Sequence, residues 1–581
     1  MKYILLHCSS RFFSHENLRN TPEQPPQPHK TADIVFRNGN IYTVDKQFKK
    51  TSSLAKRIGN TTKVVDLQGK MIMPDLVDAH MHVVSGGEFL LKCNLNYQPL
   101  PIAGLLAHVQ GCIDDEGAGD DVWLEVSGSI TKPHLDQLAT NRPVMLRSAD
   151  YHTVLANSRA LEISNINADT PGPANGVVER HPGSREPSGN IEAGKAALKL
   201  LREEGITTFQ DAAANPTFNA IFNGIKTDDA LSASVNLDYR IATPKTLGAV
   251  DGIAIKAFID GVITYPTLTA APDAPWAPNG TWIGEPYWEP AFLEQLFLAG
   301  TDVRLHTDGD LAVKVALDAA AAFEQKHSKK KFKFGLACDE VTLASDWACF
   351  AQLGVDAIMS YQWTQLSSFY IPNTFKTLAD YRLDNLQAYP QIENAGRPIV
   401  YGSDWPIDPL DEFLALKVAV TRSGDPENPN SPASFELPFD GPFPGVGEID
   451  LTREQAIRSI TINSAKFLRA DDQIGSLQKG KLADLIILEK NFLEVPKGKL
   501  GRNRVLVTVV GGEPVFIAED AGDFVQLDGL TAKFPNHEED PLNKRLAARA
   551  IGGFAGKKLS AKGQKAAQLL RKRGECLHHK H

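Results

Sequence analysis

Residues 74–82 read PDLVDAHMH, and this stretch decides the expected fold. Its apolar run ends in two histidines, His80 and His82, that lie two residues apart. On a β-strand, residues i and i+2 point to the same face, so the two imidazoles would converge on one point, as metal ligands do. The spacing alone is weak, because His579 and His581 repeat it in a basic segment where no strand is expected. The pair therefore needs partners at other strand ends.

Three further candidates follow along the chain, each at or near the end of an apolar, strand-like segment. They are His306 in VRLHTDGD, Asp404 in IVYGSDWPIDP and Lys256 in IAIKAFIDG. Taken singly, His306 is explained as a core histidine, Asp404 as a helix N-cap and Lys256 as a strand-edge charge. A buried, unpaired ammonium is costly, so such a lysine can be neutral, ion-paired or carbamylated to a bridging carboxylate ligand. Found together at successive strand ends, the set favours a metal site.

The segment between two β-rich ends alternates short apolar strands with amphipathic helices. Strand-like pieces are 206–211, 253–259, 303–307, 332–337, 355–360 and 398–403. Helix-like pieces are 192–204, 310–326, 342–353, 409–421 and 453–469. This alternation predicts an α/β protein with a parallel sheet. A closed (β/α)8 barrel is the simplest such architecture, with its site at the carboxyl ends of the strands.

Composition narrows the function classes. The 581 residues carry 61 Lys or Arg against 70 Asp or Glu, a net charge of −9 that argues against a general nucleic-acid binder. No apolar run is long enough to span a bilayer. The six cysteines are scattered without a CxxC pair, which excludes a disulfide scaffold and suits a reducing compartment. Because the N-terminal segment is a poor signal peptide, we expect the protein to be cytoplasmic.

The C-terminal segment has a different charge from the rest. Residues 541–581 carry eleven Lys or Arg and one acid, a net charge of +10, so the remainder carries −19. A solvated basic extension explains this segment, and a tether to an anionic surface or nucleic acid is the alternative.

Motifs in order along the chain carry a family resemblance. They are PDLVDAHMH (74–82), SADYHTVLANSRAL (148–161), LREEGITTFQDA (201–212), IKAFIDG (255–261), LHTDGDLAV (305–313), GSDWPIDP (402–409), SITINSAKFL (459–468) and GSLQKGKLADLIIL (475–488). This series resembles the amidohydrolase superfamily, and more narrowly its YtcJ-like branch, which includes N-substituted formamide deformylases.

The resemblance implies a TIM barrel over residues 74–471, with an insertion at about 95–175. It also implies a small β-sandwich composed of residues 32–73 and 472–518. We expect residues 1–31 to be a disordered N-terminal extension and residues 519–581 to be a basic C-terminal extension.

The resemblance further implies hydrolysis of a C–N bond in a small-molecule amide, with one or two Zn²⁺ or similar divalent ions per chain. Matched residue by residue, the metal ligands are His80, His82, His306 and Asp404, with Lys256 at the bridging, carbamylated position. Asp404 would also take the proton of the metal-activated water and pass it to the leaving nitrogen.

The resemblance also matches His152 to a pocket histidine of the branch. His152 or Tyr151 would stabilise the oxyanion, and Trp405 and Asp408 match the loop after the final strand. A homo-oligomer is left open, and neither a specific nucleic-acid partner nor a membrane span is expected.

One departure from the family bears on activity. The branch normally has a histidine ligand after the sixth strand, and here the matching segment FGLACDEVTL has Cys338. A thiolate can bind zinc, so Cys338 is a further candidate ligand; the alternative is a small buried residue in a site with altered or lost metal binding. The competing function is therefore a catalytically impaired barrel with a binding or regulatory role.

Overall fold

The structure is a computed structural model of the 581-residue chain. It describes residues 3–6, 32–45, 58–97, 100–116, 124–127, 132–147, 154–167, 170, 188–214, 216–228, 231–240, 254–263, 290–298, 302–327, 332–367, 380–435, 443, 445, 450–527 and 529–534.

Eight parallel strands form the central sheet, in the order β6, β10, β11, β12, β13, β14, β15, β16. Their bounds are Leu76–Met81, Ile206–Ala214, Ser234–Arg240, Ala254–Phe258, Asp302–Thr307, Phe334–Cys338, Asp356–Met359 and Val400–Tyr401. The first and last strands meet just beyond their ends, where Asp404 N–H donates to the His80 carbonyl at 2.8 Å. The prediction of a (β/α)8 TIM-type barrel is confirmed.

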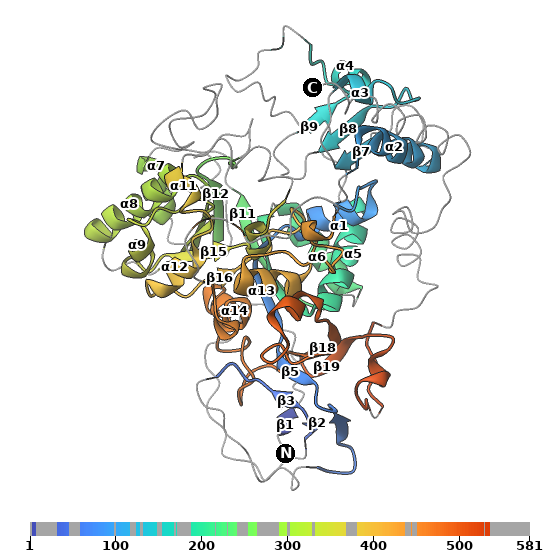
Figure 1. Cartoon of the computed structure of the whole chain (residues 1–581), viewed down its shortest axis with the longest axis vertical. Coiled ribbons are helices and arrows are strands. Elements are labelled where there is room, and N and C mark those ends of the chain that lie inside the picture. Colours follow the sequence, from blue (N-terminus) through green and yellow to red (C-terminus); the bar gives the residue numbers. More distant parts are fainter. Residues whose placement is uncertain are drawn as a thin grey trace, which may run out of the picture. The chain divides into compact units, whose positions relative to one another are not determined.

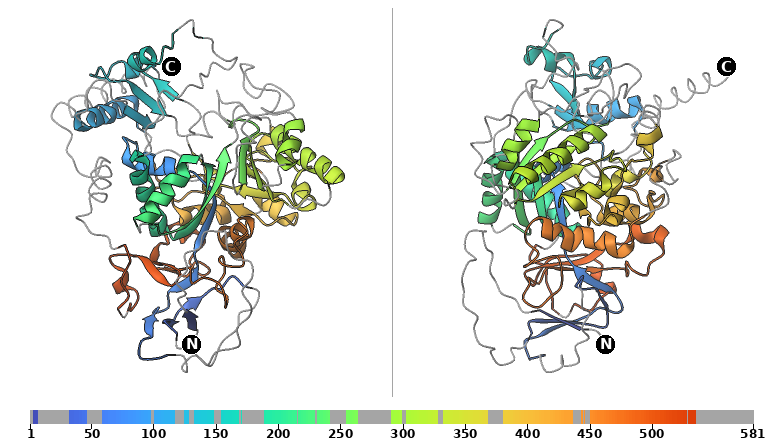
Figure 2. Two further views of the ribbon diagram at one scale, coloured as in Figure 1. Left: turned by 180° about the vertical axis from the view of Figure 1, so that it is seen from behind. Right: turned by 90° about the vertical axis from the view of Figure 1, so that its left-hand side faces the viewer.

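Helices lie on the outer side of these strands (Figure 2). They are α1 (Val83–Leu91), α5 (Ser188–Glu204), α6 (Pro216–Thr227), α7 (Pro290–Leu298), α8 (Asp310–His327), α9 (Trp347–Gln352), α11 (Asp380–Leu383), α12 (Tyr389–Asn394), α13 (Glu412–Thr421), α14 (Arg453–Arg458) and α15 (Ser464–Phe467). Helix α8 shows why such segments fold as they do: it buries Val313, Ala316, Leu317 and Ala320 along one stripe at helical spacing. Among the described residues, no helix combines the length and the apolar character needed to cross a membrane.

The strands and helices predicted for the barrel are present in the structure, but strand β11 and several helices, among them α1, α6 and α7, were not predicted. Strand β11 was not predicted, because its sequence SVNLDYR mixes polar and charged residues with only two aliphatic ones. The helix predicted over 453–469 is interrupted by a π-helical turn at Ser459–Asn463, which separates α14 from α15. Hydrophobic periodicity alone does not show such a turn.

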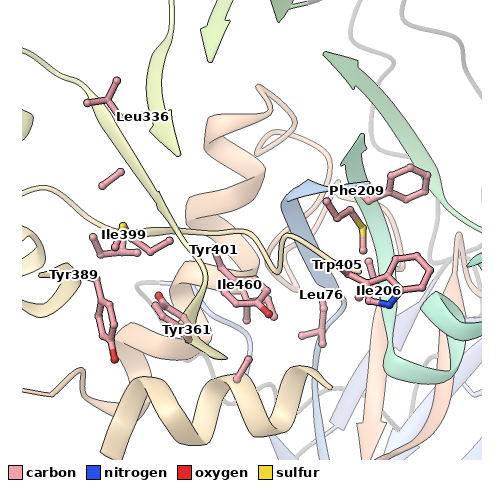
Figure 3. Close-up of a cluster of buried hydrophobic side chains, with 14 of the residues drawn as sticks. Leu76, Ile206, Phe209, Leu336, Tyr361, Tyr389, Ile399, Tyr401, Trp405 and Ile460 are labelled. Atoms are coloured by element: carbon pink, nitrogen blue, oxygen red, sulfur yellow. The ribbon is translucent and has the colours of Figure 1, made fainter. Parts of the chain in front are cut away.

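The main hydrophobic core fills the barrel and the layer between its strands and helices. Figure 3 shows part of it, including Leu76 and Ile206 from two barrel strands and the aromatic side chains of Tyr361, Tyr401 and Trp405. All five side chains are almost fully buried. Residues from the first barrel strand and from the segment after the last strand thus pack together in a single core.

Both ends of the chain contribute to a second β-rich region. A five-stranded sheet joins β3 (Asn40–Ile41) and β5 (Met71–Pro74) to β17 (Leu485–Leu488), β18 (Val505–Val510) and β19 (Glu513–Ile517), as Figure 1 shows by its blue and red strands. A three-stranded sheet holds β1 (Tyr3–Leu6), β2 (Ile34–Arg37) and β4 (Lys63–Asp66). Side chains of both sheets share one hydrophobic cluster that includes Phe36, Val65, Ile72 and Ile487. The composite β-sandwich remains a prediction.

The predicted extensions at the two ends need correction. Residues Tyr3–Leu6 pair antiparallel with β2, so the prediction of disorder over 1–31 is wrong for this apolar run, and residues 1–2 and 7–31 lie outside the described residues. At the other end, Val525 and Leu530 are buried in the second hydrophobic cluster, so the C-terminal extension begins later than residue 519. The basic segment 541–581 lies outside the described residues.

Between α1 and α5 the chain forms a separate group of elements. It contains α2 (Ile102–Glu116), α3 (Lys132–Leu135), α4 (Ser158–Ile163) and a sheet of β7 (Leu124–Ser127), β8 (Val144–Arg147) and β9 (Val154–Ala156). Cys93 and Cys112 form a disulfide there. The scattered spacing of the cysteines gave no sign of this pair, because folding brings together two residues 19 apart. The scattered cysteines therefore no longer support a reducing compartment for this protein.

Candidate metal centre

Three predicted ligands meet at the carboxyl end of the barrel. His80 lies near the end of strand β6, His82 directly follows that strand, and Asp404 follows β16. Nε2 of His82 lies 3.0 Å and Nε2 of His80 lies 3.4 Å from Oδ1 of Asp404. One ligand atom of each residue lies within 4.8 Å of the other two, an arrangement that can hold a metal ion. The i, i+2 spacing thus brings both imidazoles to one point, as the sequence predicted.

Asp78 fixes the two chain segments that carry these ligands. Its carboxylate accepts hydrogen bonds from the backbone N–H of His80 at 2.9 Å and of Ser403 at 3.2 Å. The segments also approach closely at Gly402, where a Cβ atom would lie 2.4 Å from Cβ of His80. Asp404 itself has a φ of 56°, in the left-handed region, which Asp tolerates better than most residues.

The electrostatic environment favours the cation-binding forms of His80 and Asp404. Burial, together with the nearby Lys256 ammonium, lowers the pKa of His80 to about 4, so its imidazole is neutral at pH 7. Burial would raise the pKa of the Asp404 carboxyl, but the adjacent His80 and His82 imidazoles lower it below its ordinary value. Neutral imidazoles and an ionised carboxylate are the forms that coordinate metals.

Lys256 lies next to this group. Its side chain is buried on β12, and Nζ lies 3.1 Å from Nε2 of His80. Nζ also lies 4.9 Å from the ring centroid of Phe258. The apolar strand therefore directs this lysine toward the ligands and not toward solvent.

His306 and Cys338 form a separate pair, outside the group of three. Sγ of Cys338 lies 3.1 Å from Nδ1 of His306, and Nε2 of His306 lies 2.7 Å from the Gly261 carbonyl. Since a carbonyl can only accept, Nε2 carries the proton and Nδ1 accepts from the thiol. Burial, and then the Asp404 carboxylate, raises the pKa of Cys338 well above its ordinary value, so the thiol keeps its proton.

The remaining predicted site residues have mixed positions. Trp405 is 1% exposed and packs in the barrel core, so its position gives no support to a contact with substrate. Asp408 is half-buried, and burial together with the Asp404 carboxylate raises its pKa to about 7. Tyr151 and His152 lie outside the described residues.

Sequence reasoning missed three residues that position the ligands. Asp78 precedes His80 by two residues on the same strand face, and this spacing could have identified it. Gly402 had no signal, because its role depends on contact with a strand more than 300 residues away. Asp211, within β10, accepts a hydrogen bond from the Val84 N–H at 3.4 Å and so approaches the N-terminus of α1.

The fold and the site together define a TIM-barrel protein with a candidate metal centre at the carboxyl ends of its strands. The chain belongs to the amidohydrolase family, whose profile matches residues 63–516. Membership places it among the hydrolases.

Relatives are similar over most of their length but at low identity. The chain is 24% identical to the putative amidohydrolase YtcJ of Bacillus subtilis, over 82% of this chain and 95% of the relative. It is 22% identical to the N-substituted formamide deformylase of Arthrobacter pascens, over 83% and 97%. It is 23% identical to the protein LONG AFTER FAR-RED 3 of Arabidopsis thaliana, over 84% and 92%.

Solved structures share the fold. A metal-dependent hydrolase from Pyrococcus horikoshii OT3 superposes with a TM-score of 0.59 at 20% identity, covering 80% of this chain and 98% of that chain. Its counterpart from Pyrococcus furiosus gives the same TM-score over 79% and 99%.

Proposed function

We propose that the protein is a metal-dependent hydrolase that cleaves a C–N bond in a small-molecule amide, N-formyl or N-acyl substrate. The observation that carries the proposal is the convergence of His80, His82 and Asp404, with ligand atoms within 4.8 Å of one another at the end of the barrel where sites of this fold lie. The similarity to a formamide deformylase supports N-formyl compounds as the first substrates to test.

The three residues fit a divalent cation. Oδ1 of Asp404 is buried and makes no well-formed hydrogen bond, although two imidazole nitrogens face it. Nitrogen and oxygen ligands of this kind suit zinc and similar ions. His80, His82 and Asp404 would hold the first ion, and His306, Cys338 and a carbamylated Lys256 would complete the set for one or two ions.

The chain's own residues supply the proton transfers. A divalent metal, when bound, polarises a scissile carbonyl and lowers the pKa of water. Asp404, ionised because its pKa is lowered, accepts a proton from the attacking water and delivers it to the leaving nitrogen. Asp78 holds the backbone of His80 and Ser403 in place throughout, and His152 or Tyr151 would donate to the developing oxyanion.

Carbamylation of Lys256 would remove an electrostatic conflict. A protonated Nζ at 3.1 Å from Nε2 of His80 repels any cation that binds to that nitrogen. The ammonium first loses a proton, and the neutral amine then adds to carbon dioxide with loss of a second proton. The product is a carbamate whose carboxylate attracts a cation. Metal content should therefore rise when the protein is loaded in the presence of bicarbonate, and the Lys256→Ala variant should not respond to bicarbonate.

The His306–Cys338 pair favours a second candidate, a barrel with impaired catalysis and a binding or regulatory role. In the structure the Cys338 thiol keeps its proton and donates it in a hydrogen bond to Nδ1 of His306. A metal ion would have to displace that proton to gain either ligand. If it cannot, the centre has only three strong ligands.

The test is a hydrolysis screen over formamides and N-acyl amino acids. It compares zinc-loaded protein, chelator-treated protein and the His80→Ala variant, all under non-reducing conditions. We expect hydrolysis by the loaded protein alone. The matched control is His327→Ala, which removes a partly exposed histidine near the end of α8 and should leave the rate unchanged.

Two results would count against the proposal. Activity retained by His80→Ala would reject the site. Absence of bound metal even after loading, together with absence of turnover on every substrate, would leave the impaired barrel as the better account.

A further inference from the structure

A second group of metal-binding side chains lies outside the barrel. Among the described residues, the only groups of three or more such side chains with mutually close ligand atoms are the barrel centre and the set Cys93, His108 and Cys112. One ligand atom from each of these three lies within 4.8 Å of the other two. In the structure the two sulfur atoms are joined as a disulfide. A disulfide needs no third residue, so the place of His108 calls for its own explanation.

Secondary structure brings the three residues together. His108 and Cys112 are four residues apart on helix α2, so they lie on the same face one turn apart. Cys93 follows the end of α1, and its Cα lies 5.9 Å from that of Cys112. A histidine and a cysteine at i and i+4 on a helix, with a second cysteine from a neighbouring segment, give three ligands of the kinds that zinc prefers.

A hydrogen bond fixes the orientation of His108. Its Nε2 lies 2.8 Å from the Asn94 carbonyl. Because a carbonyl oxygen can only accept, Nε2 is the donor in this bond, and Nδ1 is the ring nitrogen left to bind an ion. Asn94 is the neighbour of Cys93, so this bond ties the imidazole to the segment that holds the first sulfur. Metal-binding histidines commonly donate their other ring N–H to a carbonyl in this way.

The surroundings are apolar on one side and open on the other. Cys93 is 7% exposed and lies in a hydrophobic cluster with Leu105 and Val109, whereas His108 and Cys112 are half-buried. An ion can reach the half-buried side from solvent. Two thiolates in such a place are stabilised by a divalent cation, whose charge they balance.

We propose that Cys93, His108 and Cys112 bind one zinc-class divalent cation when the disulfide is reduced. Reduction by a dithiol breaks the S–S bond with two electrons and two protons, and the dithiol becomes a disulfide. Binding then releases the two thiol protons as each sulfur forms a bond to the cation. At a zinc–sulfur distance of about 2.3 Å, tetrahedral geometry separates the two sulfurs to roughly 3.8 Å, and water takes the fourth position.

The consequence is that one junction has two alternative cross-links. A disulfide joins the end of α1 to α2 under oxidising conditions, and a metal ion joins the same segments under reducing conditions. The fold of this region is then held in either kind of compartment.

The experiment uses the full chain with Cys338→Ser, so that no thiolate signal arises from the barrel. The protein is reduced with a dithiol, freed of reductant without oxygen and titrated with Co²⁺. We expect a thiolate-to-Co²⁺ charge-transfer band that Zn²⁺ displaces and that the oxidised protein lacks. His108→Ala should weaken Co²⁺ binding by at least about tenfold. The matched control His134→Ala, in α3 of the same region, should bind normally.

A second measurement needs no variant. In the reduced wild-type chain, Zn²⁺ should protect Cys93 and Cys112 from alkylation, as read from their peptides by mass spectrometry. The proposal is overturned if reduced protein shows no band and no protection. It is also overturned if the band persists in the Cys93→Ser, Cys112→Ser double variant, or if His108→Ala binds Co²⁺ as tightly as His134→Ala.

Discussion

The side chain of His82 faces the candidate metal centre and leaves the N-terminus of helix α1 without a capping hydrogen bond. His82 occupies the N-cap position of α1, which usually goes to Ser, Thr, Asp or Asn, and its side chain makes no capping hydrogen bond. Instead its imidazole faces Asp404. The Asp211 carboxylate, from the next barrel strand, approaches the Val84 N–H and partly replaces the missing cap. A carboxylate from the neighbouring strand thus partly replaces the cap that His82, a candidate ligand, does not supply.

Asp78 allows a prediction at the scale of one residue. Asp78→Ala leaves the buried N–H groups of His80 and Ser403 without an acceptor, each at a cost of roughly 1–3 kcal/mol. We expect lower unfolding free energy in urea and zinc affinity reduced about 10- to 100-fold, as for other residues that orient ligands. Burial raises the pKa of Asp78, so Asn resembles its protonated form, and Asp78→Asn should restore most of both quantities. Equal losses of stability and zinc affinity in the two variants would contradict the claim that residue 78 acts as the acceptor of these two N–H groups.

Cys338 allows a second prediction. If its thiolate joins the metal set beside His306, Cys338→Ser should lower metal affinity by at least about tenfold, and Cys338→His should retain or raise it. The control is Cys349→Ser, a half-exposed cysteine on α9. Competition with a chromogenic chelator measures all four proteins. If Cys338→Ser and Cys349→Ser behave alike, Cys338 is only a buried neighbour of His306.

At the scale of elements, close packing of α1 against the segment after β16 positions the site. A Cβ atom at Gly86 would lie 2.1 Å from Cζ3 of Trp405, so only glycine lets the helix approach that indole. Trp405 follows the ligand Asp404 directly, and its carbonyl accepts the His82 N–H at 2.8 Å. The helix, the indole and the candidate ligands are therefore held together by direct contacts.

Gly86→Ala is expected to destabilise the protein by about 1–3 kcal/mol through overpacking, despite the better helix propensity of alanine. It should also weaken metal binding, because Trp405 must shift. The matched control is Gly111→Ala in α2, where an added Cβ meets no atom within 4 Å and a gain of up to about 1 kcal/mol is expected. Urea unfolding of both variants checks the pair; similar stabilities would contradict the packing argument.

The sequence predicts these elements to different degrees. The barrel could be predicted because most of its strands are apolar runs and its helices have one apolar face, as α8 shows. Strand β11 could not, because its polar residues hide the pattern. The three-ligand group of His80, His82 and Asp404 could be predicted from position at strand ends. The His306–Cys338 contact and the Cys93–Cys112 bond depend on tertiary packing, which no spacing in the sequence reveals.

At the scale of the whole molecule, the candidate ligands come from the first and the last strand of the barrel, which are far apart in the sequence. His80 lies near the end of the first strand and Asp404 follows the last, so an ion held by both would join segments more than 300 residues apart. The β-rich region also unites both chain ends, since β5 pairs with β17. Loss of either link, the His80–Asp404 approach or the β5–β17 pairing, should lower the stability of the whole fold.

Metal removal is therefore expected to lower thermal stability. An ion present at 100 times its dissociation constant stabilises the native state by about 2.7 kcal/mol. Calorimetry should show a lower Tm for the wild type after chelation, and restoration on adding zinc. The His80→Ala variant should begin at the lower Tm and respond to neither treatment. A wild-type Tm that ignores chelation would indicate that the centre holds no ion.

Anomalous diffraction at the zinc edge, from crystals of zinc-loaded, non-reduced protein, tests the central claim most directly. We expect a peak at about 2.0–2.2 Å from Nε2 of His80, Nε2 of His82 and a carboxylate oxygen of Asp404. Crystals without a peak among these three residues, at full zinc loading, would contradict a metal centre in this barrel.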